Sequence, residues 1–230
     1  MLTILYEDSE IIVVEKPIGM ESQSGSGFAP DMVSELKKHT NKLCTIGQEP
    51  YIGVIHRLDK PVSGVMVYAK TPTAAAELSR QVQGNEMQKK YWAVVCGKPV
   101  DNVGNYVDYL LKDGKLNQSK IVDKGISGAK RAELRYRVLE TLEEEETRSL
   151  VEVELLTGRH HQIRVQFAGH GTPLWGDNRY NPAFTGKTAG KRCNIALIAC
   201  ELTFRHPRTG AVMTYSIEPQ AEIWKHFSKK

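Results

Sequence analysis

Cysteine is scarce in this sequence and is not arranged for metal binding or cross-linking. The 230 residues include four cysteines, which lie far apart with no CxxC pair and no interleaved histidines. A structural zinc site needs closely spaced ligands, and a disulfide framework needs a denser cysteine pattern. Both are therefore disfavoured. We expect no metal, and reduced, mostly buried thiols at Cys44, Cys96, Cys193 and Cys200.

Targeting signals and long apolar runs are also missing. Glu7 and Asp8 follow a short apolar start, where a secretory signal would have basic residues and a longer apolar run. No later stretch is long and apolar enough to span a bilayer. These features predict a cytoplasmic location and no membrane partner.

Phosphate-binding glycine loops are absent as well. No GxGxxG or GxxxxGK[ST] segment follows an apolar, strand-like run, which disfavours a doubly wound nucleotide-binding fold. The chain has no repeat, low-complexity tract or interdomain linker. With 40% hydrophobic and 25% charged residues, it is long enough for one sizeable core and too short for two comfortable domains. We expect a single domain over residues 1–230.

Charge permits an anionic partner without demanding one. The formal net charge is +4 and the sequence pI is about 8.8. RNA is compatible with this balance, but so are many proteins that bind no nucleic acid. The acidic run 143–146 is expected to be a solvated turn, because neighbouring carboxylates on a loop do not converge on one ion.

Most of the predicted elements are strands. Short apolar runs and alternating patterns indicate strands, and capping residues followed by apolar spacing indicate helices. The fold class predicted is α+β, with a mainly antiparallel mixed sheet and flanking helices and loops. Strands are predicted at 2–6, 11–15, 65–69, 91–95, 132–138, 150–155, 195–204 and 212–217, a small hairpin around 113–114, and helices from 31 to about 42, from 71 to about 87 and over 161–169.

The first segment that could carry chemistry is 55–64, IHRLDKPVSG, between two apolar runs. It places Asp59 close to His56, Arg57 and Lys60 on a tight turn. Nearby cations favour an ionised carboxylate, as a nucleophile or base in a partly dry cleft requires. Taken alone, the segment fits a structural ion pair at least as well.

The other two segments are 157–164, TGRHHQIR, and 89–92, KKYW. The first joins a strand to a helix, where backbone N–H groups and two arginines could bind an anion. A solvated helix start is the alternative, and His160 with His161 is not a metal site, because adjacent helical residues point apart. The second could stack on a base and contact phosphate, although strand aromatics commonly belong to a core.

Together these segments resemble the RluA family of RNA pseudouridine synthases. His-Arg-Leu-Asp at 56–59, followed by Ser-Gly and an apolar strand that ends in Ala-Lys-Thr at 69–71, is similar to that family's catalytic signature. The resemblance covers essentially the whole chain and implies the pseudouridine synthase catalytic fold with a central basic cleft. Further agreement lies in Lys16-Pro17-Ile18-Gly19, Lys90-Tyr91, Gly158-Arg159, 161–164, Gly176-Asp177 with Tyr180, and His206-Pro207 with Thr209-Gly210.

The resemblance also implies roles for particular residues. Asp59 matches the family's essential aspartate, Tyr91 the tyrosine that packs on the target base, and Arg164 the arginine that pairs with the aspartate. These are the catalytic residues that it implies.

The substrate-binding residues that it implies are Arg57, Ile163, Arg159 and Gln162. Ile163 matches an aliphatic residue on the other side of the base. Arg57 matches the arginine that can fill the gap left when the target nucleotide swings out. Arg159 and Gln162 belong to the same motif as Arg164.

The implied reaction breaks the N1–C1′ bond of a uridine, turns the uracil and joins C5 to C1′. One aspartate can begin it as a nucleophile at C1′ or C6, or as a base at the C2′ proton, and the sequence leaves these routes open. Base flipping is expected, at a cost of about a few kcal/mol, because the target atoms are hidden in stacked RNA. No cofactor is required. We expect a monomer that acts on ribosomal or transfer RNA.

The sequence departs from the family pattern at a few positions. Val62 replaces a common threonine, His160 a small hydroxyl residue and Ile198 a histidine. None belongs to the implied catalytic set. The signature begins almost at Met1, so we expect no S4-like RNA-binding domain before it.

Other functional classes fit less well. A non-catalytic RNA-binding or chaperone module on this fold would be expected to have lost Asp59 or Tyr91, and both are present. A glycoside hydrolase normally needs two carboxylates, and the candidate segment offers one. A zinc deaminase needs a cysteine and histidine signature that is missing.

Overall fold

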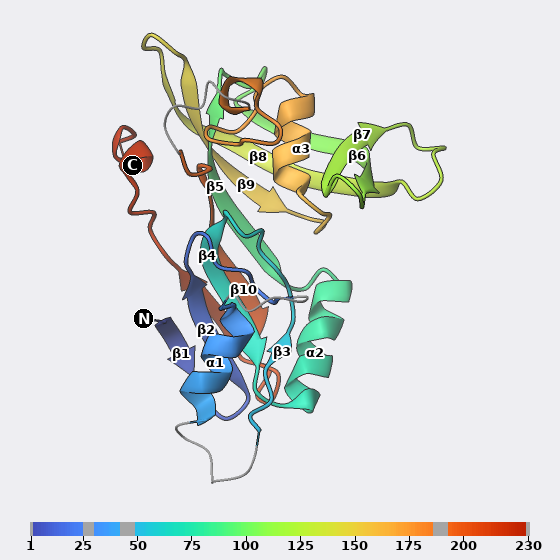
Figure 1. Cartoon of the computed structure of the whole chain (residues 1–230), viewed down its shortest axis with the longest axis vertical. Coiled ribbons are helices and arrows are strands. Elements are labelled where there is room, and N and C mark those ends of the chain that lie inside the picture. The colour runs from blue at the N-terminus through green and yellow to red at the C-terminus, as the bar shows by residue number, and fades with distance from the viewer. Residues whose placement is uncertain (1, 25–29, 42–48, 186–192, 229–230) are drawn as a thin grey trace. The chain divides into compact units, whose positions relative to one another are not determined.

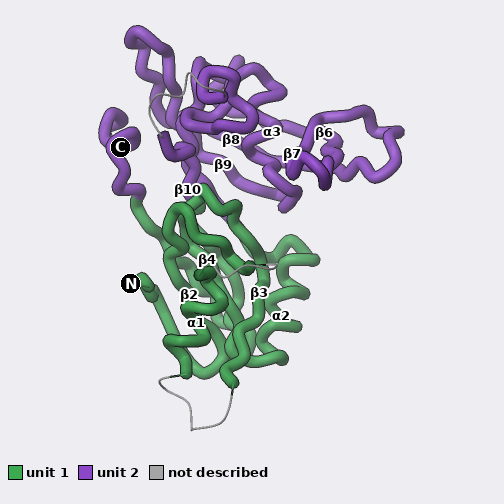
Figure 2. The backbone as a smooth tube through the Cα atoms, in the orientation of Figure 1, with its two compact units in different colours: residues 1–88, 199–218 green, residues 89–198, 219–230 purple. Residues whose placement is uncertain are grey.

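The computed structural model describes residues 2–24, 30–41, 49–185 and 193–228. The chain divides into two compact units (Figure 2): unit 1 comprises Met1–Gln88 and Ala199–Glu218, and unit 2 comprises Lys89–Ile198 and Pro219–Lys230. Antiparallel strands dominate both units and helices are few, which confirms the α+β class. That the chain forms one domain stays a prediction, and each unit is described by itself.

Unit 1 is built on strands in the order β1-β2-β4-β10, with β3 paired to β4 and β11 to β10. Strands β1 to β4 and β10 are labelled in Figure 1. The pairings β1–β2, β2–β4, β3–β4 and β10–β11 are antiparallel, so the predicted N-terminal hairpin is confirmed. The elements are β1 (Thr3–Glu7), β2 (Ile11–Lys16), α1 (Met32–Asn41), β3 (Gly53–Val54), β4 (Ser63–Ala69), α2 (Pro72–Gln83), β10 (Leu197–Arg205) and β11 (Val212–Ser216).

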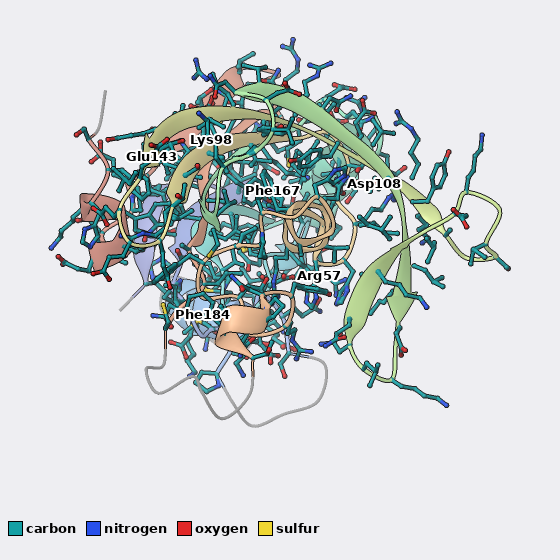
Figure 3. All side chains as sticks on the ribbon, turned by 90° about the horizontal axis from the view of Figure 1, so that it is seen from above. Arg57, Lys98, Asp108, Glu143, Phe167 and Phe184 are labelled. Atoms are coloured by element: carbon teal, nitrogen blue, oxygen red, sulfur yellow. The ribbon has the colours of Figure 1, made fainter. Side chains whose placement is uncertain are left out.

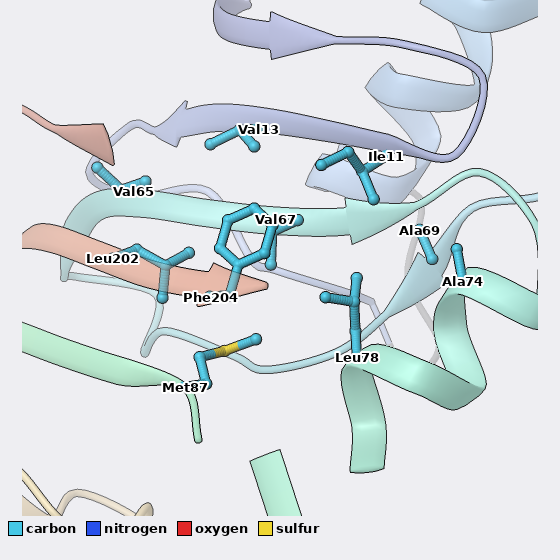
Figure 4. Packing of buried hydrophobic residues seen from close by; sticks show 10 residues of the cluster. All are labelled: Ile11, Val13, Val65, Val67, Ala69, Ala74, Leu78, Met87, Leu202 and Phe204. Atoms are coloured by element: carbon cyan, nitrogen blue, oxygen red, sulfur yellow. The ribbon is translucent and has the colours of Figure 1, made fainter. Parts of the chain in front are cut away.

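The core of unit 1 explains its uninterrupted apolar runs. Ile11 and Val13 of β2 point into a cluster shared with β4, β10 and α2 (Figure 4). Their neighbours Ile12 and Val14 point to the opposite face and are also 0% exposed. Because β2 is buried on both faces over its first four residues, these residues are all apolar instead of alternating with polar ones. The cluster comprises Ile11, Val13, Val65, Val67, Ala69, Ala74, Leu78, Met87, Leu202 and Phe204.

Both helices of unit 1 begin at the predicted caps. The Asp31 carboxylate accepts the N–H of Ser34 at 2.7 Å, and the Thr71 hydroxyl accepts the N–H of Ala74 at 3.1 Å. Helix α2 ends at Gln83, several residues before the predicted end near Met87. Met87 instead packs into the core from beyond the helix. The predicted end of α1, near residue 42, lies outside the described residues.

Unit 2 contains strands in the order β5-β9-β8-β6-β7, and each neighbouring pair in this order is antiparallel. Helix α3 lies beside this sheet, and Phe167 on α3 is enclosed by other side chains (Figure 3). The elements are β5 (Gln88–Cys96), β6 (Val103–Asp113), β7 (Gln118–Val122), β8 (Lys130–Leu142), β9 (Arg148–Leu155), α3 (Gln162–Gly169), the 3₁₀ turn η1 (Pro182–Phe184) and α4 (Glu222–Lys225).

The hairpin predicted around 113–114 is larger than expected. Strand β6 pairs with β7 near its end and with β8 along most of its length. Its apolar residues do not line one buried face, because Val103 and Val107 are 69% and 45% exposed whereas Leu110 is buried. Backbone pairing with β8, more than burial, therefore extends β6.

The connection between β8 and β9 is a solvated acidic turn, as predicted. Residues 143–146 are exposed, and the side chain of Glu143 can be followed in Figure 3. In the described part of the chain, no group of His, Cys, Asp and Glu side chains is placed to hold a metal ion. The helices in those ranges are all too short or too polar to cross a membrane.

Candidate active site

Asp59 lies on the loop between β3 and β4 in unit 1, and its neighbours on both sides are anchored. The buried hydroxyl of Ser22 donates to the carbonyl of Leu58 at 2.9 Å and accepts the N–H of Leu58 at 3.0 Å. On the other side, the carbonyl of Lys60 accepts the N–H of Gly19 at 2.9 Å. The backbone that carries Asp59 is therefore fixed by residues 16–22.

Lys16 supplies a further anchor from beneath this loop. Its side chain is 0% exposed, and its ammonium donates to the carbonyls of Pro17, Met20 and Lys60 at 3.0, 2.6 and 3.3 Å. Burial lowers the pKa of Lys16 to about 8, against the opposing effect of the negative charge on Asp59. Lys16 is therefore still mainly charged at neutral pH. Three donated hydrogen bonds need the three N–H groups of the ammonium form.

A glycine allows the chain to enter β4 directly after this loop. Gly64 has φ +143°, and a Cβ at this position would lie 2.4 Å from the Cβ of Ala199. Any larger residue would push β4 away from Ala199 on β10. The Ser-Gly pair that follows the loop is thus a packing requirement of the strand that holds Asp59 in place.

The Asp59 side chain is partly exposed, and Arg57 beside it is exposed. Arg57 makes no hydrogen bond or ion pair with any residue that the structure describes. His56, in contrast, accepts the N–H of Val67 through Nε2 at 3.3 Å, and so holds the loop to β4. Of the cations in this segment, Arg57 is the one presented to solvent without a described partner.

The loop from β9 to α3 in unit 2 is held by the Gln162 amide. The amide oxygen accepts the Thr157 hydroxyl at 2.8 Å and the N–H of Arg159 at 2.9 Å, and the amide nitrogen donates to the Glu133 carbonyl at 3.0 Å. Gln162 is 3% exposed. Arg159 is exposed, and its Nε donates to the Arg131 carbonyl at 2.8 Å. His161, at φ +54°, turns the chain into the helix.

Arg164 on α3 forms a buried, two-pronged ion pair with Asp177. Its Nε and Nη2 donate to the two carboxylate oxygens at 2.8 and 2.7 Å. Arg164 is 2% exposed and Asp177 is 0% exposed. Such parallel bonds fix the plane of a guanidinium as well as its position. Asp177 is thus one carboxylate partner of Arg164, and the pairing of Arg164 with Asp59 that the resemblance implies stays a prediction.

Tyr180 covers the face of the same guanidinium. The Arg164 guanidinium carbon lies 5.2 Å from the centre of the Tyr180 ring, within the range of cation–π attraction. The Tyr180 oxygen accepts the N–H of Ser119 at 2.8 Å and lies 2.8 Å from Nδ1 of His161. Since Ser119 donates to that oxygen, the hydroxyl proton can point to His161. Tyr180 thereby joins β7, the helix start and the arginine.

Tyr91 and Ile163 are both placed by ordered elements of unit 2. Tyr91 is 6% exposed in β5, opposite Val153 of β9. Ile163 is 4% exposed in the first turn of α3. The adjacent lysines are partly buried, and burial lowers the pKa of Lys89.

The predicted site residues are divided between the units. Asp59 and Arg57 belong to unit 1, whereas Tyr91, Arg159, Gln162, Ile163 and Arg164 belong to unit 2. Each group is locally well ordered by hydrogen bonds, and their meeting in one basic cleft stays a prediction. Lys16 and Asp177 stand in motifs of the resemblance but had no role assigned, and Ser22 was not singled out. In the structure Lys16 and Ser22 anchor the Asp59 loop, and Asp177 binds Arg164.

The departures from the family pattern have local explanations. Val62 is 2% exposed and Ile198 is 4% exposed, so both are packing residues. His160 stacks on His161, with ring centres 3.7 Å apart. Its ring nitrogens lie 2.9 Å from the Ser119 hydroxyl and 3.1 Å from the Asn117 side chain. The histidine thus attaches the hairpin of β6 and β7 to the start of α3.

The chain is similar to known RNA pseudouridine synthases. A family model described as RNA pseudouridylate synthase matches residues 10–169. An uncharacterized RNA pseudouridine synthase of Aquifex aeolicus is 36% identical over 225 residues, covering 94% of this chain and 69% of that protein. Ribosomal large subunit pseudouridine synthase D of Zymomonas mobilis is 34% identical over 225 residues, with the same coverage.

A solved structure shares the fold. The human RNA pseudouridylate synthase domain containing 4 superposes with a TM-score of 0.77 at 21% sequence identity, covering 97% of this chain and 90% of that one. At this identity the likeness concerns the fold alone.

Proposed function

This chain belongs to the RluA-type family of RNA pseudouridine synthases, enzymes that isomerise uridine in RNA, and we propose that it acts on selected uridines of structured RNA through Asp59. The observation that carries the proposal is the anchoring of the Asp59 loop. Leu58 and Lys60 are tied on both sides, while the carboxylate between them is partly exposed. A group that must attack a flipped nucleotide needs such a fixed backbone and an accessible side chain.

In the proposed mechanism, Arg164 pairs with Asp59 and keeps it ionised in a partly dry site. Asp59 then begins the cleavage of the N1–C1′ bond by attack at C1′ or C6, or by removal of the C2′ proton. The uracil turns between Tyr91 and Ile163 and C5 joins C1′. The bond from Asp59 to C1′ or C6 breaks again, or the proton returns to C2′ in the third route, and the C5 proton is lost while N1 gains one. Stacking on Tyr91 retains the detached base during the rotation.

Base flipping leaves a gap in the RNA stack, and we propose that Arg57 fills it. Its exposed side chain without a partner in the described ranges, two residues from Asp59, supports this role. Arg159 is the candidate phosphate contact at the start of α3, since it is also exposed. Gln162 serves the RNA indirectly, by holding the loop that carries Arg159.

The first RNA to test is large-subunit ribosomal RNA, because a relative at 34% identity is named for it. Transfer RNA is the alternative. We further propose that the enzyme is a cytoplasmic monomer that acts as one catalytic domain and needs neither metal nor cofactor. Asp59 can begin the reaction alone, so the chemistry has no step that requires them.

The test is Asp59→Asn. We expect the variant to fold and to bind RNA as the wild type does, but to form no pseudouridine, because the amide is neither a nucleophile nor a base. Pseudouridine is mapped in total RNA from cells that carry the wild-type gene, the variant or no copy. Sites that vanish without the gene and return only with the wild type identify the target.

A control separates loss of chemistry from loss of folding. Asp101→Asn removes an exposed carboxylate that has no hydrogen bond within the described residues, and should restore every site. Wild-type modification by Asp59→Asn would refute the role of the aspartate. RNA binding without any site that depends on the gene would favour the alternative, a non-catalytic RNA-binding or chaperone module.

A further inference from the structure

We propose that Asp177 is a positioning residue that aims the Arg164 guanidinium at Asp59. This inference rests on the proposed function and adds a residue to it. The bonds to Asp177 use Nε and Nη2 of Arg164. These two bonds fix the plane of the guanidinium, and with it the direction in which Nη1 points.

Asp177 is itself held in place by its own turn. One carboxylate oxygen accepts the N–H of Arg179 at 2.9 Å and that of Tyr180 at 3.2 Å. The backbone N–H donates to the Leu174 carbonyl at 3.3 Å, and the carbonyl accepts the N–H of Asn181 at 3.1 Å. The Asp177 carboxylate therefore has a fixed position, and the Arg164 guanidinium must take the orientation that allows both hydrogen bonds to it.

The residue before Asp177 enforces this placement. Gly176 has φ +74°, and a Cβ there would lie 2.3 Å from the carbonyl oxygen of Asn194. Only glycine can take this conformation and this close approach at once. The turn delivers Asp177 to one defined position behind α3, against the Nε edge of Arg164, while Tyr180 covers the guanidinium face.

Stability alone does not account for a pair buried so deeply. Removing two charges from water costs free energy that their attraction repays only in part, and apolar residues of similar volume often do as well. A catalytic arginine gains something else from the pair, namely orientation. Asp177 also partly balances the positive charge of Arg164.

The experiment measures single-turnover rates and RNA affinities with an RNA that carries the mapped uridine. Asp177→Asn preserves size and one acceptor oxygen for the N–H groups of Arg179 and Tyr180, but it loses one of the two oxygens that hold Arg164. We expect the rate to fall roughly ten- to a hundred-fold, as misplacement of a catalytic group by about 1 Å can cause. RNA affinity should stay within about two-fold, because Asp177 is fully buried.

A double variant distinguishes positioning from a merely structural role. In Arg164→Lys the bidentate pair is already lost, so adding Asp177→Asn should lower the rate no further. Effects that multiply would show that Asp177 acts independently of Arg164, and would overturn the inference. If Asp177→Asn does not fold, Asp177→Glu can be used, because it keeps the charge but displaces the carboxylate. A wild-type rate for Asp177→Glu would also overturn the inference.

Asp8→Asn is the matched control in unit 1. The Asp8 carboxylate accepts two backbone N–H groups, from Glu10 and Ile11, and bonds to the buried His206, much as Asp177 accepts two N–H groups and a side chain. Asp8→Asn should lower the free energy of unfolding without lowering the single-turnover rate. An inactive wild type would defeat the proposed function, whereas full activity of Asp177→Asn beside an inactive Asp59→Asn would defeat only this inference.

Discussion

At the scale of single residues, completely buried charges have defined partners in the described structure. Lys16 donates hydrogen bonds to three carbonyls. The Asp177 carboxylate accepts hydrogen bonds from the Arg164 guanidinium and from two backbone N–H groups. Exposed pairs such as Lys225 with Glu222 are worth only about 0–1 kcal/mol. The buried charges are therefore the ones whose loss should be felt, and they lie behind the candidate catalytic residues.

We expect the Tyr91 ring, and not its hydroxyl, to act on the substrate by stacking on the target base. Tyr91→Phe keeps the ring, and with it the stacking surface for a base, but removes the hydroxyl. If stacking is its whole contribution, the single-turnover rate and RNA affinity of this variant should equal those of the wild type. Tyr91→Ala should lower the rate strongly, since base stacking is worth about 1–3 kcal/mol. Loss of activity in the phenylalanine variant alone would assign a chemical role to the hydroxyl.

The sequence could single out Asp59, Tyr91 and Arg164 as candidates because each stands in a short motif with recognisable neighbours, and their catalytic roles stay predictions. It could not reveal that Asp177 binds Arg164. Asp177 lies beyond the end of α3, and the turn that returns it to the helix depends on the contact of Gly176 with Asn194. No periodicity marks such a contact. A motif names the reactive side chain, while its support comes from tertiary packing.

At the scale of elements, the conformation of the loop between β3 and β4 depends on Ser22, which lies before α1 in the sequence. Ser22 holds both backbone groups of Leu58, and the hydroxyl of Tyr68 donates to the Ser22 carbonyl at 3.1 Å. The loop is thus rigid without belonging to a strand or helix. Sequence patterns predicted the strand on its far side but could not reveal this cross-link.

Ser22→Ala tests whether this rigidity matters for the reaction. The substitution leaves the N–H and carbonyl of Leu58 without their partner, which should cost about 1–3 kcal/mol of unfolding free energy in a urea titration. The Asp59 backbone would loosen, so the single-turnover rate should fall several-fold or more, with RNA affinity little changed. Both quantities can be measured on the same protein preparation.

Ser149→Ala is the control for that experiment. Ser149 is also 0% exposed, and its hydroxyl donates to the Gly97 carbonyl at 2.9 Å, in unit 2 and away from the candidate residues of that unit in sequence. It should lose similar stability while keeping the wild-type rate. Equal loss of rate in both variants would mean that general destabilisation, and not the Asp59 loop, explains the effect.

At the scale of the whole molecule, burial decided which sequence predictions succeeded. Strands with inward apolar faces, such as β2 and β4, were located closely, and so were helices with capping side chains at Asp31 and Thr71. Strand β6 was underestimated because its apolar residues fall on both faces of the strand and so give no alternating pattern. The end of α2 was overestimated because Met87 continues the apolar pattern from outside the helix.

The last prediction concerns the acid stability of unit 1. Asp8 follows β1, and its carboxylate lies 2.8 Å from Nε2 of the buried His206, which precedes β11. Burial would raise the pKa of Asp8. The hydrogen bonds from Ile11 and Glu10, with those from the His206 and Tyr6 side chains, outweigh it and hold the pKa below its usual range.

A lowered carboxyl pKa means that the folded state binds this proton less readily than the unfolded chain. The stabilisation is therefore complete above the unfolded pKa, near 4, and is lost as the pH falls through the lower folded value. Asp8→Asn should be less stable than the wild type in urea at pH 7, and the difference should shrink toward pH 2. Asp101→Asn should have the same free energy of unfolding as the wild type at both pH values. A difference for Asp8→Asn that stays constant with pH would show that packing of the side chain, and not its charge, stabilises this junction between the N-terminal hairpin and the turn before β11.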